Sequence, residues 1–367
     1  MRKHAVVGLV VALIVLAGCS RGGSTTAAGT ETGAGGYRTW ASHDAIVEDA
    51  KQEGSLKVLT SMQEETNAAI KKGFEAKYPF IDLDIQEQTG SDDQRILLEV
   101  QSGASDVDVL HTSGESYPDY LPYLEHVDLL KMASNGTLDM PREMIDPGQP
   151  EAMAAGSGLG GFAYNKKLLP AADVPKTWDD FLSPKFKGKQ FLADIEPTNL
   201  ASLAAAWGED KLKTYAAAIG SQQPIWSRGD TVSLTAMAAG QYKLIVGSNY
   251  HSSFRAQKKS PDTLAIGLLD PVPVRLTQLQ SIRKGADHPA AGVLFLEYLA
   301  SADVQKALDE LEPMQSSIYA PGSALNELTK GRQVSVLGWD NFQKLQPWEQ
   351  LILKEWGFPT AQVKEKK

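Results

Sequence analysis

Apolar positions along most of this chain repeat with two periods that follow one another in turn, one typical of helices and one typical of strands. Helical repeats cover residues 44–53 and 64–78, and residues 56–60, 81–85 and 107–110 have the apolar runs or two-residue alternation of strands. This alternation predicts an α/β fold, in which helices cover a sheet and ligands bind at the carboxyl ends of its strands.

The alternation is interrupted by a glycine-rich approach at residues 156–161 and resumes beyond it. A short strand is expected at 162–164, and Thr177 with Asp180 forms a capping box for a helix start. We therefore expect the chain to enter a second α/β domain here. After residue 189, the expected helices are 200–207, 211–219, 234–239 and 288–308, and the expected strands are 224–226, 243–246, 264–268 and 275–282.

Length and charge narrow the class of protein. The chain has 367 residues, which is enough for two domains that each bury a core. It carries 36 basic and 45 acidic residues, a net charge of −9. A broad nucleic-acid-binding surface needs the opposite balance, so we expect no nucleic-acid partner.

The first residues have the pattern of an export signal. Arg2 and Lys3 precede an apolar core at 6–16, and the segment Leu-Ala-Gly-Cys ends at Cys19. This pattern resembles the bacterial lipobox, with a plain secretory signal as the alternative. We expect a signal peptide at 1–18, lipidation of Cys19, and a flexible tether at 19–36 that anchors the protein to the outside of a bacterial membrane. Cys19 is also the only cysteine, which excludes disulfides.

Polar side chains at the expected strand ends are the candidates for a ligand pocket. From the first domain they are Thr60, Ser61, Ser91, Thr112, Ser113 and Glu115, and from the second they are Thr198, Arg228, Tyr250, His251 and Arg255. Arginine can hold a carboxylate or phosphate with two hydrogen bonds, and hydroxyl groups suit the same anions.

Each candidate also has a structural interpretation. Thr60, Ser61 and Thr198 can cap helices, and capping is the favoured role of Ser91 because Gln94 completes a capping box. Loop carboxylates such as that of Glu115 are often solvated, and surface arginines more often form ion pairs than clamps for anions. His111 is expected to be structural. Trp207 and Trp226 can stack on a flat or sugar-like ligand, but packing in the helical layer is favoured.

Several segments together resemble a known family. The runs Ala50-Lys51-Gln52-Glu53-Gly54 and Val-Pro-Lys-Thr-Trp-Asp-Asp-Phe-Leu at 174–182 are similar to those of the solute-binding proteins of bacterial ABC importers, closest to the iron(III)-binding branch. The resemblance implies two lobes around a ligand cleft. It places residues 37–158 and 283–367 in the first lobe and 159–282 in the second, with the C-terminal segment 339–358 packed on the first. It also implies a monomer that delivers a small ligand to ABC permease subunits.

The same resemblance suggests a ligand. The iron(III)-binding branch has two adjacent tyrosines in the loop that corresponds to Tyr250 and His251, together with a synergistic anion. Here histidine replaces the second tyrosine. Tyr250 and His251 can still bind Fe(III) with Glu115 or His111 opposite, but a neutral nitrogen donor suits this hard ion less well than a phenolate. The alternative ligand is an organic anion such as a phosphonate, a sugar phosphate, a carboxylate or a thiamine-like solute.

An enzymatic role finds little support in the sequence. No Gly-x-Ser-x-Gly elbow, His-Glu-x-x-His helix or Ser-x-x-Lys arrangement with its partners is present. The paired carboxylates Asp92-Asp93 and Asp179-Asp180 stand at expected helix starts, where the helix dipole accounts for them. We therefore predict a binding protein without catalytic residues or a catalytic cofactor.

Overall fold

A computed structural model describes residues 30–33, 36–89 and 92–358 of the chain. The predicted signal peptide, most of the predicted tether, Cys19 and Ser91 lie outside these residues. No helix in the described ranges is both long enough and apolar enough to cross a membrane.

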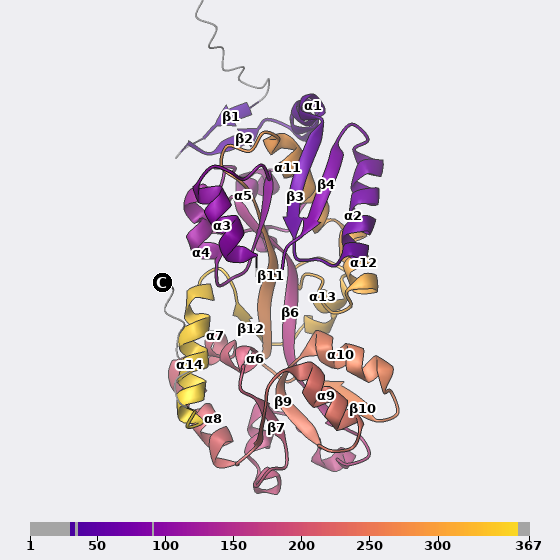
Figure 1. Ribbon diagram of the computed structural model, residues 1–367, viewed down its shortest axis with the longest axis vertical. Helices are drawn as coiled ribbons and strands as arrows, with labels where there is room; N and C mark the ends of the chain where they lie inside the picture. Colours follow the sequence, from indigo (N-terminus) through magenta and orange to yellow (C-terminus); the bar gives the residue numbers. More distant parts are fainter. Residues whose placement is uncertain (1–29, 34–35, 90–91, 359–367) are drawn as a thin grey trace, which may run out of the picture.

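The predicted α/β architecture is confirmed, with helices on both sides of a mixed sheet (Figure 1). In the first lobe, the parallel strands β4, β3 and β5 are followed by the antiparallel strands β11 and β6. The strands are β3 (Ser55–Thr60), β4 (Asp82–Glu87) and β5 (Val109–Thr112), and the helices are α1 (His43–Glu53), α2 (Glu64–Lys77), α3 (Asp93–Gln101), α4 (Tyr117–Tyr120) and α5 (Leu129–Ser134). A small hairpin-like pair, β1 (Thr30–Thr32) and β2 (Arg38–Trp40), lies beside them.

The second lobe continues the same sheet in the order β6, β9, β7 and β8, with β10 on the other edge of β6. Its strands are β7 (Leu192–Asp194), β8 (Ile225–Ser227), β9 (Leu244–Asn249) and β10 (Leu264–Gly267), and its helices are α6 (Thr198–Ala201), α7 (Ala204–Trp207), α8 (Glu209–Ser221), α9 (Asp230–Ala238) and α10 (Tyr250–Lys259). The predicted capping box of Thr177 and Asp180 is present at a 3₁₀ turn, Trp178–Leu182.

Two long strands, β6 (Ala152–Asn165) and β11 (Val272–Ile282), run through both lobes. The first half of β6 pairs with β11, and its second half pairs with β9 and β10. At the change of partner the backbones approach closely: a Cβ atom on Gly161 would lie 2.6 Å from the carbonyl oxygen of Gly267. Glycine is therefore required where the crossing strand enters the second lobe.

The predicted helix at 288–308 is two helices, α11 (Pro289–Ala300) and α12 (Ala302–Leu311), separated by Ser301 in an extended conformation. Every residue of α11 after the first proline is buried. A helix that is apolar on all sides belongs in the interior, and α11 occupies the core of the first lobe.

The C-terminal segment does not pack as expected. Strand β12 (Val334–Leu337) pairs with the start of β11, and α14 (Leu345–Glu355) lies against α8 of the second lobe. The Trp356 indole donates a hydrogen bond to the Ala216 carbonyl over 3.1 Å. Between β12 and α14, the rings of Trp339 and Phe342 contact Tyr117 of the first lobe. Burial of Trp348 and Trp356 against α8 outweighs the expected packing on the first lobe, and this segment contacts both lobes.

Helix α13 (Ala324–Thr329) follows α12 after a turn at residues 312–323 that lies near the crossing strands. Within this turn, the Gln315 carbonyl accepts a hydrogen bond from the Ser157 amide on β6 over 3.4 Å. The turn is therefore fixed to the junction between the lobes.

Candidate functional site

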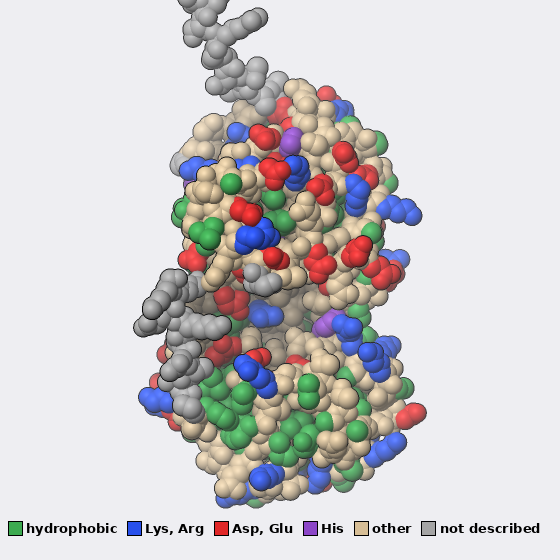
Figure 2. All heavy atoms as spheres, in the orientation of Figure 1, with side chains coloured by type: hydrophobic (Ala, Val, Ile, Leu, Met, Phe, Trp, Pro, Cys, Tyr) green, Lys and Arg blue, Asp and Glu red, His purple; other side chains and the backbone are tan. Residues whose placement is uncertain are grey.

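A hollow crosses the middle of the molecule between the two lobes (Figure 2). The crossing strands β6 and β11 join the lobes at this level, with α10 on one side of them and α14 on the other (Figure 1). The predicted site residues lie in the first lobe, on the α10 side and on the α14 side.

The threonine at the end of β3 forms its side-chain hydrogen bonds within the first lobe. Thr60 is fully buried, and its hydroxyl donates to the Asn67 side-chain oxygen over 2.7 Å and accepts from the Met62 amide over 3.3 Å. Ser61, the next residue, is exposed. Of these two candidates, Ser61 is therefore the one whose side chain is accessible to a solute.

The loop after β5 likewise has one candidate that is hydrogen-bonded within the lobe and one that is exposed. The Ser113 hydroxyl bonds to Asp93 and to Ser116, both over 3.1 Å, whereas Glu115 is exposed. Thr112 is 2% exposed, and its hydroxyl has no hydrogen-bond partner among the described residues. The predicted Ser91 capping position is shifted, because Asp92 is the N-cap residue of α3.

On the α10 side, Tyr250 and His251 begin a helix and do not lie in the expected loop. Asn249 caps α10 by accepting a hydrogen bond from the Ser252 amide over 3.0 Å. Tyr250 is 8% exposed and packs against apolar residues that include Leu159 and Val274. Burial raises the pKa of its phenol, although Arg332 nearby favours the ionised form. Its hydroxyl forms no hydrogen bond within the described part of the chain.

His251 is held in one tautomer by the backbone. Its Nδ1 atom lies 2.5 Å from the Pro313 carbonyl oxygen, and since a carbonyl can only accept, Nδ1 carries the hydrogen. In the neutral ring, Nε2 then has the free lone pair. A backbone carbonyl that orients a histidine in this way is a common second partner of metal-binding histidines.

The turn that holds His251 also reaches the end of β3. Glu312 accepts a hydrogen bond from the Gln63 amide over 2.8 Å and one from the Gln315 amide group over 3.1 Å. His251 of the second lobe is thereby connected, through residues 312–315, to the chain that follows Ser61 in the first.

The α14 side is dominated by charged groups. Glu349 of α14 accepts a hydrogen bond from the Thr198 hydroxyl over 2.5 Å. Burial is the main factor that raises the pKa of Glu349, and the charges of Glu115 and Glu196 raise it further, while Thr198 and the Arg275 charge oppose the increase. The Glu349 carboxylate therefore lies within electrostatic range of two other carboxylates, those of Glu115 and Glu196, and of the Arg275 guanidinium. These groups come from both lobes and from a crossing strand.

Sequence reasoning nominated Glu115 and Thr198 from this group but missed Glu196, Glu349 and Arg275. These residues come from three distant parts of the chain, and no local motif marks them. Their common surroundings arise from the antiparallel crossing strand and from α14 packing on the second lobe. Thr198 is correctly placed at a helix start, but its side chain bonds to Glu349 and forms no cap.

The two predicted anion-binding arginines are not brought together. The Arg228 side chain is 74% exposed and pairs with Glu196 over 2.9 Å. Arg255 is exposed and borders a shallow cavity of about 320 Å³ between α9 and α10. Asp230 accepts a hydrogen bond from the Asn249 amide over 2.7 Å, and burial raises its pKa to about 6.

His111 has the surroundings of a structural residue. It is 7% exposed, and burial lowers its pKa to about 4, so it is neutral at physiological pH. Within the described ranges, no group of three or more His, Cys, Asp or Glu side chains is arranged to hold a metal ion. Any ion bound here would need the Tyr250 phenol or donors brought by the solute.

One cluster away from the hollow has the connectivity of a hydrolase triad. The Ser55 hydroxyl lies 3.0 Å from His288 Nε2, and His288 Nδ1 lies 2.9 Å from the buried Asp108 carboxylate. However, Glu53 accepts hydrogen bonds from the amides of Ala290 and Ala291 at the adjacent helix start, so those donors are not free to stabilise an oxyanion. The cluster attaches α11 to the amino ends of β3 and β5.

Two α/β lobes, joined by two continuous strands and separated by a hollow with polar side chains at strand ends, define a two-lobed ligand-binding protein. The chain belongs to the bacterial extracellular solute-binding protein family, whose model matches residues 69–327. The expected family resemblance is confirmed. Proteins of this kind deliver solutes to the permease subunits of ABC importers and are not a class of enzymes, and membership implies an extracytoplasmic location.

Solved structures show the same fold at low sequence identity. Trichodesmium IdiA (FutA), in complex with iron and citrate, has a TM-score of 0.67 and 17% identity over 83% of this chain and 100% of its own. Apo ferric ion-binding protein A from Pasteurella haemolytica has a TM-score of 0.63 and 16% identity over 83% of this chain and 98% of its own. Iron-bound HitA from Pseudomonas aeruginosa has a TM-score of 0.55 and 18% identity over 82% and 99%. The search of curated proteins gave no match.

Proposed function

We propose that this protein captures iron(III), alone or as a small anionic complex, in the hollow between its lobes and delivers it to an ABC importer. Tyr250 and His251 bind the ion from the second lobe; Glu115, the predicted ligand from the first lobe, lies near Glu349 on the α14 side and is not included in the set. A synergistic anion or carboxylate ligand fills the remaining positions.

The observation that carries the proposal is the state of the two α10 donors. His251 donates through Nδ1 to Pro313, which leaves Nε2 as a lone-pair donor, and the adjacent Tyr250 hydroxyl has no partner in the described residues. A bound trivalent ion would offset the burial that raises the Tyr250 pKa, since a positive charge favours the phenolate. The similar structures of IdiA (FutA) and HitA contain iron, which supports the same ligand.

The proposal includes the membrane anchor. Lipid attached to Cys19 holds the protein at the outer face of the membrane as a monomer, and residues 19–36 tether it. A Cys19→Ala variant is expected to move from the membrane fraction to the soluble fraction. If it stays with the membrane, the proposed anchor is wrong.

The iron proposal is tested by visible absorption. Chelated Fe(III) is titrated into the purified protein with and without phosphate or carbonate, and a phenolate-to-iron charge-transfer band is expected. The band should vanish in Tyr250→Phe. In His251→Ala, the apparent affinity for Fe(III) should fall at least tenfold. Tyr242→Phe, which alters a half-buried tyrosine just before β9, serves as the matched control and should keep the band.

A different result would redirect the assignment. If no band forms and phosphonates or sugar phosphates raise the melting temperature, the ligand is an organic anion and iron is excluded. Arg275, the arginine of the α14 side, would then be the first residue to replace, before Arg228 and Arg255.

A further inference from the structure

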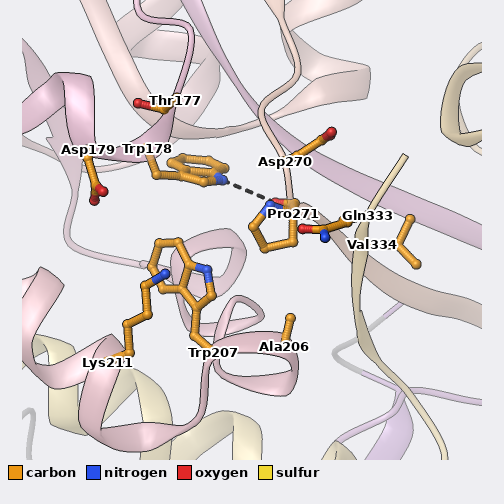
Figure 3. Close-up of a pocket in the computed structure, with 10 residues that line it drawn as sticks. All are labelled: Thr177, Trp178, Asp179, Ala206, Trp207, Lys211, Asp270, Pro271, Gln333 and Val334. Atoms are coloured by element: carbon orange, nitrogen blue, oxygen red, sulfur yellow. Dashed lines mark hydrogen bonds between the residues drawn. The ribbon is translucent and has the colours of Figure 1, made fainter. Parts of the chain in front are cut away.

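The second lobe contains a cavity of about 500 Å³, which is connected to Tyr250 through Arg332, the ion-pair partner of Asp270 in the cavity lining. Two indoles form its walls, and charged or amide side chains surround them (Figure 3). The residues that line it include Trp178, Trp207, Asp179, Lys211, Asp270 and Gln333. None of them belongs to the α10 or α14 groups described above, so the cavity has no part in the proposed iron site.

The aromatic walls are fixed in place. Trp178 is 2% exposed, and its indole donates to the Pro271 carbonyl oxygen over 3.1 Å. The Trp207 ring meets it edge-on, with centroids 6.5 Å apart and planes at 89°. Tyr215 supports both, because its ring packs 5.2 Å from that of Trp207 and its hydroxyl donates to the Trp178 carbonyl over 2.9 Å. The cavity therefore has a rigid apolar corner.

Two polar side chains at the cavity have unused hydrogen-bonding capacity. The side chains of Asp179 and Gln333 are exposed and form no hydrogen bond with any described residue. Asp270, by contrast, is paired with Arg332 over 2.8 Å. A carboxylate acceptor and an amide with both donor and acceptor groups are therefore available beside the indoles.

Charge excludes two ligand classes. The lining carries two carboxylates, of which Asp270 is paired with Arg332, and one ammonium, so it offers no excess positive charge to hold an anion. The Lys211 ammonium already lies 4.5 Å from the centre of the Trp207 ring, so a cationic ligand would meet a like charge at the face that attracts it. A neutral ligand with an apolar face and several hydroxyl groups meets neither obstacle.

We propose that this cavity is a second ligand site that binds a neutral sugar of one or two rings. The Lys211 ammonium moves away from the Trp207 ring, the C–H face of a sugar ring packs on the indole in its place, and the sugar hydroxyl groups bond to Asp179 and Gln333. A volume of about 500 Å³ is within the range of small-molecule sites. The rigid indoles lower the conformational entropy lost on binding.

Isothermal calorimetry on the full-length protein in detergent tests this site. Glucose, maltose and trehalose are titrated at millimolar concentrations, with choline and glucose 6-phosphate as charged competitors. At least one neutral sugar should bind with saturable heat, and neither charged compound should. Trp207→Ala should abolish binding, while Trp226→Phe, which changes a half-buried tryptophan packed against Trp356, should not.

A second variant tests the site even if Trp207→Ala fails to fold. Asp179 and Gln333 are exposed, so the double variant Asp179→Ala, Gln333→Ala should fold normally and bind sugar at least tenfold more weakly. The site is refuted if no neutral sugar binds, if the double variant binds as well as the wild type, or if choline binds in its place. The iron absorption band is independent of all these outcomes, so either proposal can fail alone.

Discussion

The two sides of the interlobe hollow are built from different chemistry. On the α10 side, Tyr250 is enclosed by apolar residues and the His251 ring is oriented by a backbone carbonyl. On the α14 side, the Glu349 carboxylate lies near the charges of Glu115, Arg275 and Glu196. An oriented imidazole nitrogen and a phenol that can ionise suit a metal ion, whereas the carboxylates of the α14 side repel one another and are countered by Arg275 and by Arg228, which pairs with Glu196.

The difference also separates two ways in which a protein can hold ionisable groups near a ligand. The α10 side relies on burial and backbone hydrogen bonds, which persist at any ionic strength. The α14 side relies on charge compensation, which salt and pH both weaken. Replacements on the two sides should therefore respond to pH in different ways.

The largest expected effect concerns Asp230, which accepts a hydrogen bond from the residue that caps α10. Its pKa is raised from 3.8 to about 6, so the folded state disfavours the ionised carboxylate and loses stability as the pH rises from about 4 to above 6. Asp230→Asn retains the acceptor and removes the charge. It should stabilise the protein by about 3 kcal/mol at pH 7 and by nearly nothing below pH 4.

Urea unfolding at several pH values measures the difference in the free energy of unfolding between Asp230→Asn and the wild type. Asp262→Asn, which alters an exposed carboxylate of the same lobe, is the control and should change stability little at any pH. A difference between Asp230→Asn and the wild type that does not vary with pH would contradict the buried-charge explanation.

A smaller effect is expected on the α14 side. Arg275→Met removes the positive charge that favours the ionised form of Glu349, so it should cost about 1–2 kcal/mol at pH 7. The Glu349 pKa is already raised above 4.5, so the penalty for its ionisation is present above that pKa and disappears as the carboxylate is protonated. Thermal unfolding should show the variant approaching the wild type below pH 4.5, and a constant deficit would indicate lost packing.

The smallest effect is expected at Thr198. Thr198→Val removes the hydroxyl that donates to Glu349, which should cost about 1 kcal/mol and raise the Glu349 pKa further. Thr214→Val, which removes a hydroxyl that donates to the Asp210 carbonyl on the exposed face of α8, is the matched control. If the two variants lose the same stability at pH 5 and pH 8, Thr198 has no special relation to Glu349.

Local patterns predicted much of the fold. The helix expected at 64–78 is α2 at 64–77, and the strand expected at 81–85 is β4 at 82–87. The break between α11 and α12 was missed, although Ser301 before Ala302 and Asp303 has the residues of a helix start. The long run of apolar residues on either side concealed this signal.

The site was less predictable because it depends on contacts between distant segments. The sequence identified Tyr250 and His251 but could not show that Tyr250 turns into an apolar cluster while His251 bonds to Pro313. Arg275 and Glu349 carry no local signature, and they interact because a crossing strand and the C-terminal helix meet beside the second lobe. The lobe boundaries at 158 and 282 remain a prediction.

The C-terminal segment also limits how the lobes can rotate. Two adjacent strands alone form a joint that can both bend and twist. The chain from Trp339 to α14 adds a third attachment, off the axis of those strands, because it touches Tyr117 above and α8 below. An off-axis attachment resists torsion and leaves bending as the softer motion. Opening the gap by bending therefore strains the Pro313 and Glu312 hydrogen bonds on the α10 side and the Tyr117 ring contacts on the α14 side.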